Sequence, residues 1–207
     1  MSKKAINQNT NYDSELLDSI GSNFIFDTNP INRLKNTTNN QKKENNVDEI
    51  DREKELNELK LQINSIIDCD LKDNSKKIVL GDGNIHSPIM LIGEAPGILE
   101  DSAGLTFLGE VGDLLKKMLN AINIKKENIY STYAVNFRPP EDRKPTSTEI
   151  KRYSQFLQKQ ISIIKPKLII LMGSTAMESL TGLNNKISIE RGKWKEVIVK
   201  NTVYNVI

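Results

Sequence analysis

One glycine-rich segment, GEAPGILEDSAGLTFLG from Gly93 to Gly109, holds most of the residue types that could do chemistry. It begins with a tight turn in which Gly93 and Gly97 flank Pro96. Such a turn can present backbone N–H groups to an anionic oxygen or to a carbonyl oxygen. The spacing therefore predicts a loop that is able to bind an oxygen atom through its main chain.

The same loop carries the carboxylates of Glu94, Glu100 and Asp101 and the ring of Phe107. Carboxylates repel phosphate, and the Gly-Lys-Ser/Thr ending of a P-loop is missing, so the pattern argues against an ordinary nucleotide-phosphate loop. Phe107 contributes little to a helix or strand there, which leaves a functional role open. On spacing alone, solvated charges and a ring that ties the loop to the core explain the same residues.

A second loop, NFRPPEDRKPT over residues 136–146, is basic and stiffened by prolines. Its Arg138 and Arg143 could be held against a phosphate backbone at low entropic cost, with Pro139 between them. A proline-rich surface turn without a partner explains the same composition. The two interpretations stay open on spacing alone.

The chain has one cysteine, Cys69, and one histidine, His86, among its 207 residues. These counts exclude an internal disulfide and a zinc site of the usual Cys/His kind, and they leave a Ser-His-Asp triad only through His86. One free cysteine and no secretory signal predict a cytoplasmic protein. The longest apolar runs, such as Leu168 to Met172, are far shorter than the roughly 18 residues of a membrane helix.

From residue 78 onward, strands and helices alternate. Expected strands are 87–92, 128–135, 167–172, 197–199 and 203–207, and expected helices are 112–122, a helix that Thr146 caps and Pro166 ends, and a helix opened by Gly173, Ser174 and Thr175. This alternation predicts an α/β fold, a three-layer α/β/α arrangement with a central parallel sheet. Ligands bind such sheets beyond the carboxyl ends of the strands, which selects the loops 93–109 and 136–145 and the turn at Gly173.

The chain divides near residue 60. Residues 1–60 form an N-terminal extension, with a possible docking helix at 14–33 and an Asn/Lys-rich linker at 36–46, and residues 61–207 form the domain. Residues 47–67 have apolar side chains at near-helical spacing and predict an amphipathic helix.

Taken together, the motifs resemble the family 4 uracil-DNA glycosylases, in an alphaproteobacterial-like branch. The resemblance rests on GEAPG-x2-ED-x2-G-x2-F-x-G, on RPP-x2-R-x-PT and on LIILMGSTA, and it covers residues 69–207. It implies the uracil-DNA glycosylase fold and hydrolysis of the N-glycosidic bond of flipped-out deoxyuridine in base-excision repair. Uracil-containing DNA would be the partner, with no membrane, and we expect a monomer.

The resemblance also implies a role for particular residues. Phe107 would stack on the flipped uracil, Glu94 would line the pocket as the catalytic carboxylate, and Glu100 would exclude the thymine methyl group. The implied uracil contacts are Gly93, Glu94, Ala95, Glu100, Phe107 and Tyr133, and the implied DNA contacts are Arg138, Pro139 and Arg143.

Two departures concern the pocket and the cofactor. Tyr133 stands where family members have an asparagine that pairs with the uracil edge, and a phenol offers one rotating oxygen where an amide offers a fixed acceptor and donor. Of the four family cysteines that bind a 4Fe-4S cluster, only Cys69 is kept, with Ile66, Phe137 and Tyr153 at the other positions. We therefore expect no cluster, no other cofactor and no metal.

A third departure lies at Ile207, where a His-Pro-Ser segment with a catalytic histidine would follow in the family. His86 is expected at the opposite end of the sheet and does not replace it. We therefore expect weak or absent activity, and the alternative is a catalytically inactive DNA-binding remnant. A nucleotide or phosphate binder is a further alternative, against which the acidic GEAPG loop argues.

Overall fold

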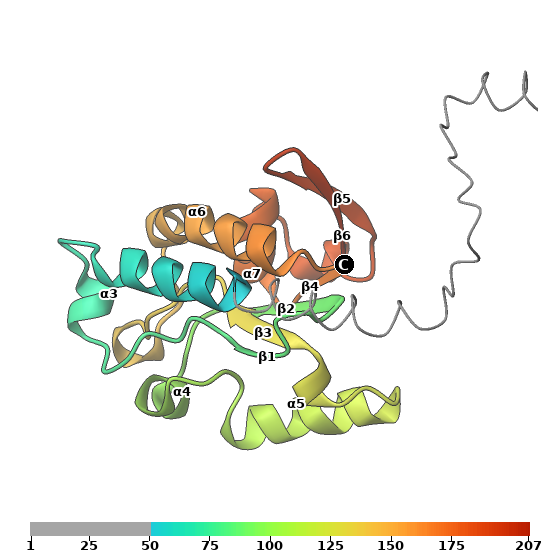
Figure 1. Cartoon of the computed structure of the whole chain (residues 1–207), viewed down its shortest axis with the longest axis horizontal. Helices are drawn as coiled ribbons and strands as arrows, with labels where there is room; N and C mark the ends of the chain where they lie inside the picture. Colours follow the sequence, from blue (N-terminus) through green and yellow to red (C-terminus); the bar gives the residue numbers. More distant parts are fainter. Residues whose placement is uncertain (1–50) are drawn as a thin grey trace, which may run out of the picture. The chain divides into compact units, whose positions relative to one another are not determined.

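Six strands form one sheet in the order β1-β3-β2-β4-β6-β5 in the computed structural model of the chain, which describes residues 51–207 (Figure 1). The strands are β1 (Asp82–Gly83), β2 (Ile89–Gly93), β3 (Tyr130–Tyr133), β4 (Leu168–Leu171), β5 (Lys195–Val199) and β6 (Thr202–Val206). The four central strands are parallel, as predicted. The edge strands β1 and β5 run antiparallel to their neighbours, which the strand pattern did not indicate. The predicted docking helix at 14–33 and the linker at 36–46 lie outside the described residues.

Helices cover both faces of this sheet, as the alternating pattern predicted. They are a helix over residues 51–64, α3 (Asp70–Asp73), α4 (Ile98–Ala103), α5 (Gly109–Ala121), α6 (Ser147–Ile164), α7 (Ser174–Thr181) and α8 (Ile187–Glu190), with short 3-10 turns η1 (Lys126–Asn128) and η2 (Pro140–Asp142). In Figure 1, the 51–64 helix and α6 lie on one side of the sheet, and α4 and α5 lie on the other. Within residues 51–207, each helix is too short or too polar to span a bilayer.

Side chains of β2 point alternately to the two faces of the sheet, and both faces are covered by a hydrophobic core. Met90 and Ile92 are buried on the face covered by the 51–64 helix and α6, and Leu91 is buried on the face covered by α5. Because successive side chains of a strand point to opposite faces, an uninterrupted apolar run can serve both layers only in the middle of a sheet. β2 is flanked by β3 and β4 accordingly.

The longest helix, α6, starts and stops where the sequence predicted. The Thr146 hydroxyl accepts a hydrogen bond from the Glu149 N–H at 3.3 Å, and the Glu149 carboxylate accepts one from the Thr146 N–H at 2.7 Å. This reciprocal pair is a capping box. The helix ends at Lys165, whose φ of 52° is left-handed, and Pro166 follows.

The helix over residues 51–64 crosses residue 60, where the sequence composition changes. Its Leu56, Leu59 and Ile63 belong to the same buried cluster as residues of α6. Arg52 also donates hydrogen bonds to the carbonyl oxygens of Ile85 and Ile164. The first described helix is thus part of the core of the domain.

Only half of the apolar face of α5 is packed. Leu115 and Leu119 are buried against the sheet, whereas Leu114, Met118 and Ile122 are about 60% exposed. The five side chains cover a continuous arc of the helix, and of these only Leu115 and Leu119 pack against the sheet.

This difference predicts unequal costs of truncation on α5. Leu119→Ala should lower the free energy of unfolding by about 2–4 kcal/mol, since it removes packed atoms, while Met118→Ala should change it by less than about 0.5 kcal/mol. Urea unfolding followed by circular dichroism measures both. Equal losses in the two variants would contradict the exposure of Met118.

Candidate functional site

The carboxyl end of β2 is held on both sides by the strands next to it. Beyond the ends of β3, the Ala134 N–H donates to the Gly93 carbonyl at 2.9 Å and the Val135 N–H donates to the Glu94 carbonyl at 3.3 Å. On the other side, the Met172 N–H donates to the Ile92 carbonyl at 2.8 Å. The turn at Gly93 therefore starts from a rigid part of the sheet, at the carboxyl ends of the strands. Ligands bind at this end in sheets of this type.

The turn presents main-chain donors. Within the described residues, no acceptor is bonded to the N–H groups of Glu94 and Ala95, both of which are partly exposed. Pro96 has no N–H group, and the N–H of Gly97 is already bonded to the Glu100 carboxylate at 3.2 Å. Two adjacent amide donors at a strand end can bind a carbonyl or anionic oxygen, as the GEAPG spacing predicted.

The Glu94 side chain points toward the next loop along the sheet edge. Its Oε2 atom accepts a hydrogen bond from the Thr175 hydroxyl at 2.6 Å. Thr175 is buried in the first turn of α7, immediately after the Gly173 turn. The loops after β2 and β4 therefore meet at this carboxylate. The sequence singled out both loops but assigned no role to Thr175.

The other two carboxylates of the loop are buried and bind backbone amides. Glu100 accepts hydrogen bonds from the N–H groups of Gly97 and Leu108, at 3.2 and 2.8 Å. Asp101 accepts hydrogen bonds from the N–H groups of Lys76 and Lys77. Solvated loop charges, one of the sequence interpretations, are therefore excluded for this pair. Both carboxylates fix the loop.

Phe107 is held in a left-handed backbone conformation, with φ of 48°. This conformation is uncommon for a residue with a large side chain. Its N–H donates to the Tyr133 hydroxyl at 2.9 Å, and its carbonyl accepts from the Lys126 ammonium at 3.1 Å. A Cβ atom at Gly112 would collide with the Phe107 carbonyl, so the first turn of α5 closes on this residue through a glycine. Several contacts over-determine the position of Phe107.

The Tyr133 and Phe107 rings pack together over Gly93. Their centroids are 5.0 Å apart and their planes are inclined by 45°. A Cβ atom at Gly93 would lie 2.8 Å from the Tyr133 ring and 2.9 Å from the Phe107 ring, so only glycine allows this packing. Both rings are buried, with 6% of Phe107 and 5% of Tyr133 exposed. Burial raises the pKa of the Tyr133 phenol, and the charges of Glu100 and Asp82 raise it further, so this group keeps its proton.

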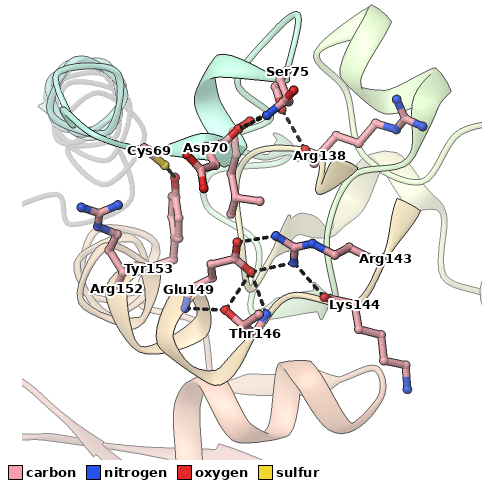
Figure 2. Close-up of polar contacts among 12 residues, drawn as sticks. Cys69, Asp70, Ser75, Arg138, Arg143, Lys144, Thr146, Glu149, Arg152 and Tyr153 are labelled. Carbon is pink, nitrogen blue, oxygen red and sulfur yellow. Dashed lines mark hydrogen bonds and ion pairs between the residues drawn. The ribbon is translucent and has the colours of Figure 1, made fainter. Parts of the chain in front are cut away.

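The arginines of the second loop are paired with carboxylates, and Figure 2 shows the pair of Arg143 with Glu149. Arg138 donates two hydrogen bonds to Asp142, at 2.6 and 2.8 Å. Arg143 donates two to Glu149, at 2.9 and 2.7 Å. Pro139, which the resemblance places at the DNA, is buried. The loop is therefore rigid, as its prolines predicted, but its cations already have partners.

These pairs shift the pKa values of the groups that form them. The Arg143 guanidinium, together with hydrogen bonds from Thr146, lowers the pKa of Glu149 from 4.5 to about 2. The Arg138 guanidinium also lowers the pKa of Asp142. Both carboxylates stay charged at neutral pH, so a phosphate group must compete with them for the two guanidinium groups.

Cys69 lies in an aromatic cluster, next to Tyr153 (Figure 2). Its Sγ atom is 3.2 Å from the Tyr153 hydroxyl, and the Tyr153 and Phe137 rings meet edge to face at 6.2 Å. All three side chains are buried, and Ile66 packs against the same core. Burial raises the pKa of the Tyr153 phenol, and the bond with Cys69 raises it further. This corner holds one thiol and one neutral phenol.

His86 is exposed in the turn that precedes β2, at the amino end of the strand. The sequence predicted this placement. The single histidine is therefore remote from the turn at Glu94, which leaves the strand at its carboxyl end. Among residues 51–207, no group of three or more His, Cys, Asp and Glu side chains is placed to bind a metal ion.

An apolar cavity of about 360 Å³ lies beside the Gly173 turn. Its apolar lining comes from β4, α7, α8 and the end of β6, with Ile170, Leu171, Met177, Ile187 and Val206. Its charged edge holds Arg191 together with Lys193 and Lys195, both of which are ion-paired with Glu190. The third loop selected from the sequence therefore also borders a cavity.

Comparison with known proteins identifies a matching family and several relatives. Residues 80–206 match the family model described as the uracil DNA glycosylase superfamily. The type-4 uracil-DNA glycosylase of Archaeoglobus fulgidus is 35% identical over 146 residues, which are 69% of this chain and 73% of the relative. That of Thermotoga maritima is 37% identical over 123 residues, 59% of this chain and 64% of the relative. A DNA polymerase of Bacillus phage SP01 is 32% identical over 128 residues, 61% of this chain and 14% of the polymerase.

The Glu149 pair predicts how stability depends on pH. Because the folded-state pKa is about 2 and the ordinary value is 4.5, the pair stabilises the fold above pH 4.5, and this contribution is lost as the pH falls toward 2. We expect a loss of about 1–2 kcal/mol, after allowing for the partial exposure of the pair. Glu149→Gln keeps a capping side chain but removes the charge, so urea unfolding between pH 6 and pH 2.5 should show a flatter pH dependence for this variant. An unchanged pH dependence would contradict the assignment.

Proposed function

Since the chain belongs to the uracil DNA glycosylase superfamily, we propose that it is a uracil-DNA glycosylase of base-excision repair. It hydrolyses the N-glycosidic bond of a deoxyuridine that is flipped out of DNA. The observation that carries this proposal is the pair of available N–H groups, of Glu94 and Ala95, at the carboxyl end of β2 beside the ring of Phe107. This edge combines donors for a carbonyl oxygen with an aromatic ring, which are the two elements that recognise an extruded base.

The reaction needs hydrogen-bond donors that stabilise the negative charge on the departing uracil, and it needs a bound water molecule. As the bond between C1′ and the base nitrogen breaks, its electron pair passes to uracil, and N–H donors fixed beforehand stabilise the charge on its carbonyl oxygen. We assign this role to the main chain of Glu94 and Ala95. The Glu94 carboxylate positions the water molecule whose oxygen bonds to C1′, and the proton that this water loses neutralises the uracil anion. One carboxylate oxygen binds Thr175, and we assign the other to the reacting water.

Glu100 forms the wall of the proposed pocket next to C5 of uracil. Two backbone N–H groups bind its carboxylate and keep it from rotating away. A rigid wall at C5 leaves no room for the methyl group of thymine, whereas a mobile side chain would yield. The amide bonds of Glu100 therefore support a role in excluding the normal base.

Arg138 and Arg143 are the proposed contacts to the DNA backbone. Arg138 is paired with Asp142 of its own loop and Arg143 with Glu149 of α6, and both pairs are partly exposed. The carboxylate of the Arg138 pair is the more exposed of the two, and exposed ion pairs contribute little to stability, so a phosphate group can replace Asp142 at small cost. The pairs hold the guanidinium groups in a fixed place until DNA arrives.

We propose that the protein works without the 4Fe-4S cluster of its family. A cluster of this type is bound by four thiolates. The four family positions hold one cysteine, two aromatic residues and an isoleucine, and these side chains pack against each other or the same core. The residues present do not fit the group. Contacts among Cys69, Phe137 and Tyr153 would hold together the chain segments that the 4Fe-4S cluster holds together in the family.

A DNA-binding protein without catalysis is the second candidate. The burial of Phe107 favours it, because the ring is covered by Tyr133 and must gain exposure before a base can stack on it. In this role the basic loop binds DNA and the glycosidic bond stays intact. Abasic-site formation distinguishes the two candidates.

The activity test uses a uracil-containing oligonucleotide and alkaline cleavage of abasic sites. The wild-type protein should form abasic sites at uracil and leave a thymine control intact. Phe107→Ala should lower kcat/KM by about 10-fold or more, since base–aromatic stacking is worth roughly 1–3 kcal/mol.

Two control variants show whether the lower kcat/KM of Phe107→Ala reflects lost stacking on the base. Lys76→Ala removes an exposed cation and should retain activity, and Leu119→Ala removes a side chain as buried as Phe107 from elsewhere in the same core cluster. Equal losses in Phe107→Ala and Leu119→Ala would mean that Phe107 acts through packing alone. Absence of abasic sites with retained DNA binding would favour the second candidate.

The DNA contact of Arg138 is tested by salt dependence. Arg138→Gln should weaken duplex binding and reduce the slope of log K against log salt concentration by about 1, because one phosphate contact is lost. Asp142→Asn should tighten binding, since Arg138 no longer has a competing carboxylate. Arg152→Gln is the matched control, an exposed arginine on α6 that bonds only the Asp68 carbonyl among the described residues. An equal change of slope in Arg138→Gln and Arg152→Gln would contradict the assignment.

A further inference from the structure

Thr175 joins the Gly173 turn to the acidic loop after β2 through its side chain. It lies in the first turn of α7 and is 4% exposed, and its hydroxyl donates to Glu94 Oε2 at 2.6 Å. The distance is that of a charge-assisted bond between a hydroxyl and a carboxylate. Among the described residues, Thr175 is the only donor bonded to the Glu94 side chain.

The main chain and the side chain of Glu94 are fixed from opposite directions. The Val135 N–H binds the Glu94 carbonyl from the β3 side. Thr175 binds the carboxylate from the β4 side, since α7 follows β4 and β4 pairs with β2. Without the hydroxyl, the main chain stays in place while the carboxylate is free to rotate.

The position of Thr175 is itself well determined. The Met172 N–H anchors the end of β4 to the Ile92 carbonyl at 2.8 Å, and Gly173 then turns with φ of 100°. This turn starts α7, in which Thr175 and the neighbouring Ala176 are buried. The hydroxyl therefore reaches Glu94 from a rigid helix rather than from a loop.

We propose that Thr175 is a positioning residue, which holds the Glu94 carboxylate in the orientation required to place the attacking water. This inference rests on the proposed glycosylase function. Thr175 does not touch the base. Its effect passes through one oxygen of Glu94 and leaves the other oxygen directed at the water.

The first test is the split between kcat and KM on a uracil-containing oligonucleotide. Thr175→Val keeps the shape but removes the donor, and it should lower kcat by about 10²-fold, since misplacing a reacting group by an ångström costs about that factor. KM should stay the same, because the N–H donors and the DNA contacts are untouched. Thr175→Ser restores a hydroxyl and should recover most of the activity.

Ser174→Ala is the matched control for this test. Ser174 precedes Thr175 in the same helical turn, and no hydrogen bond of its hydroxyl is found within the described residues, so its kcat should equal that of the wild type. A Thr175→Val variant with normal kcat would overturn the proposal. So would a Thr175→Ser variant as impaired as Thr175→Val, which would indicate packing by the methyl group.

The second test needs no activity. Thermal unfolding of Glu94→Ala, Thr175→Val and the double variant forms a cycle, and if the bond exists the double variant should melt at nearly the same temperature as Glu94→Ala alone. Additive decreases would overturn the contact. A wild-type protein without glycosylase activity would overturn the proposed function and the catalytic part of this inference, while the cycle would still decide whether Thr175 holds Glu94.

Discussion

The packing of two aromatic rings over Gly93 is the constraint on which the rest of the site depends. Phe107 and Tyr133 come from segments separated by the whole of α5, and they meet where a side chain at Gly93 would collide with both. A hydrogen bond from the Phe107 N–H to the Tyr133 hydroxyl adds direction to this contact. Packing of the two rings fixes the position of the loop after β2 relative to the end of β3. The turn at Glu94 then projects from an edge that cannot shift.

The acidic residues of the site divide into two groups with different tasks. Glu100 and Asp101 are buried and bind backbone N–H groups, so their charges are compensated and they hold the loop closed. Glu94 is partly exposed and binds one hydroxyl, which leaves it able to meet a ligand. Burial of a carboxylate is costly unless donors surround it. Of the three carboxylates, only Glu94 is therefore available to a ligand, whereas Glu100 and Asp101 stabilise the conformation of the loop.

Sequence patterns predicted the elements better than the contacts between them. The central parallel strands, the capping box of Thr146 and Glu149 and the remote position of His86 follow from local spacing. The pairing of Arg138 with Asp142 did not, because it depends on the left-handed backbone of Glu141 and Asp142. The bond between Thr175 and Glu94 did not either, because it joins loops that are far apart in the sequence. Exposure along α5 does not follow from the pattern either, since periodicity shows which residues share a face and not what covers them.

The most direct test of the site is to map amide shifts in ¹⁵N-labelled protein as a single-stranded uracil oligonucleotide is added. If the base binds at the edge after β2, the N–H signals of Glu94, Ala95 and Phe107 should move most, and those near His86 should stay. Shifts confined to the cavity beside Gly173, or to the end of the sheet at His86, would contradict the account.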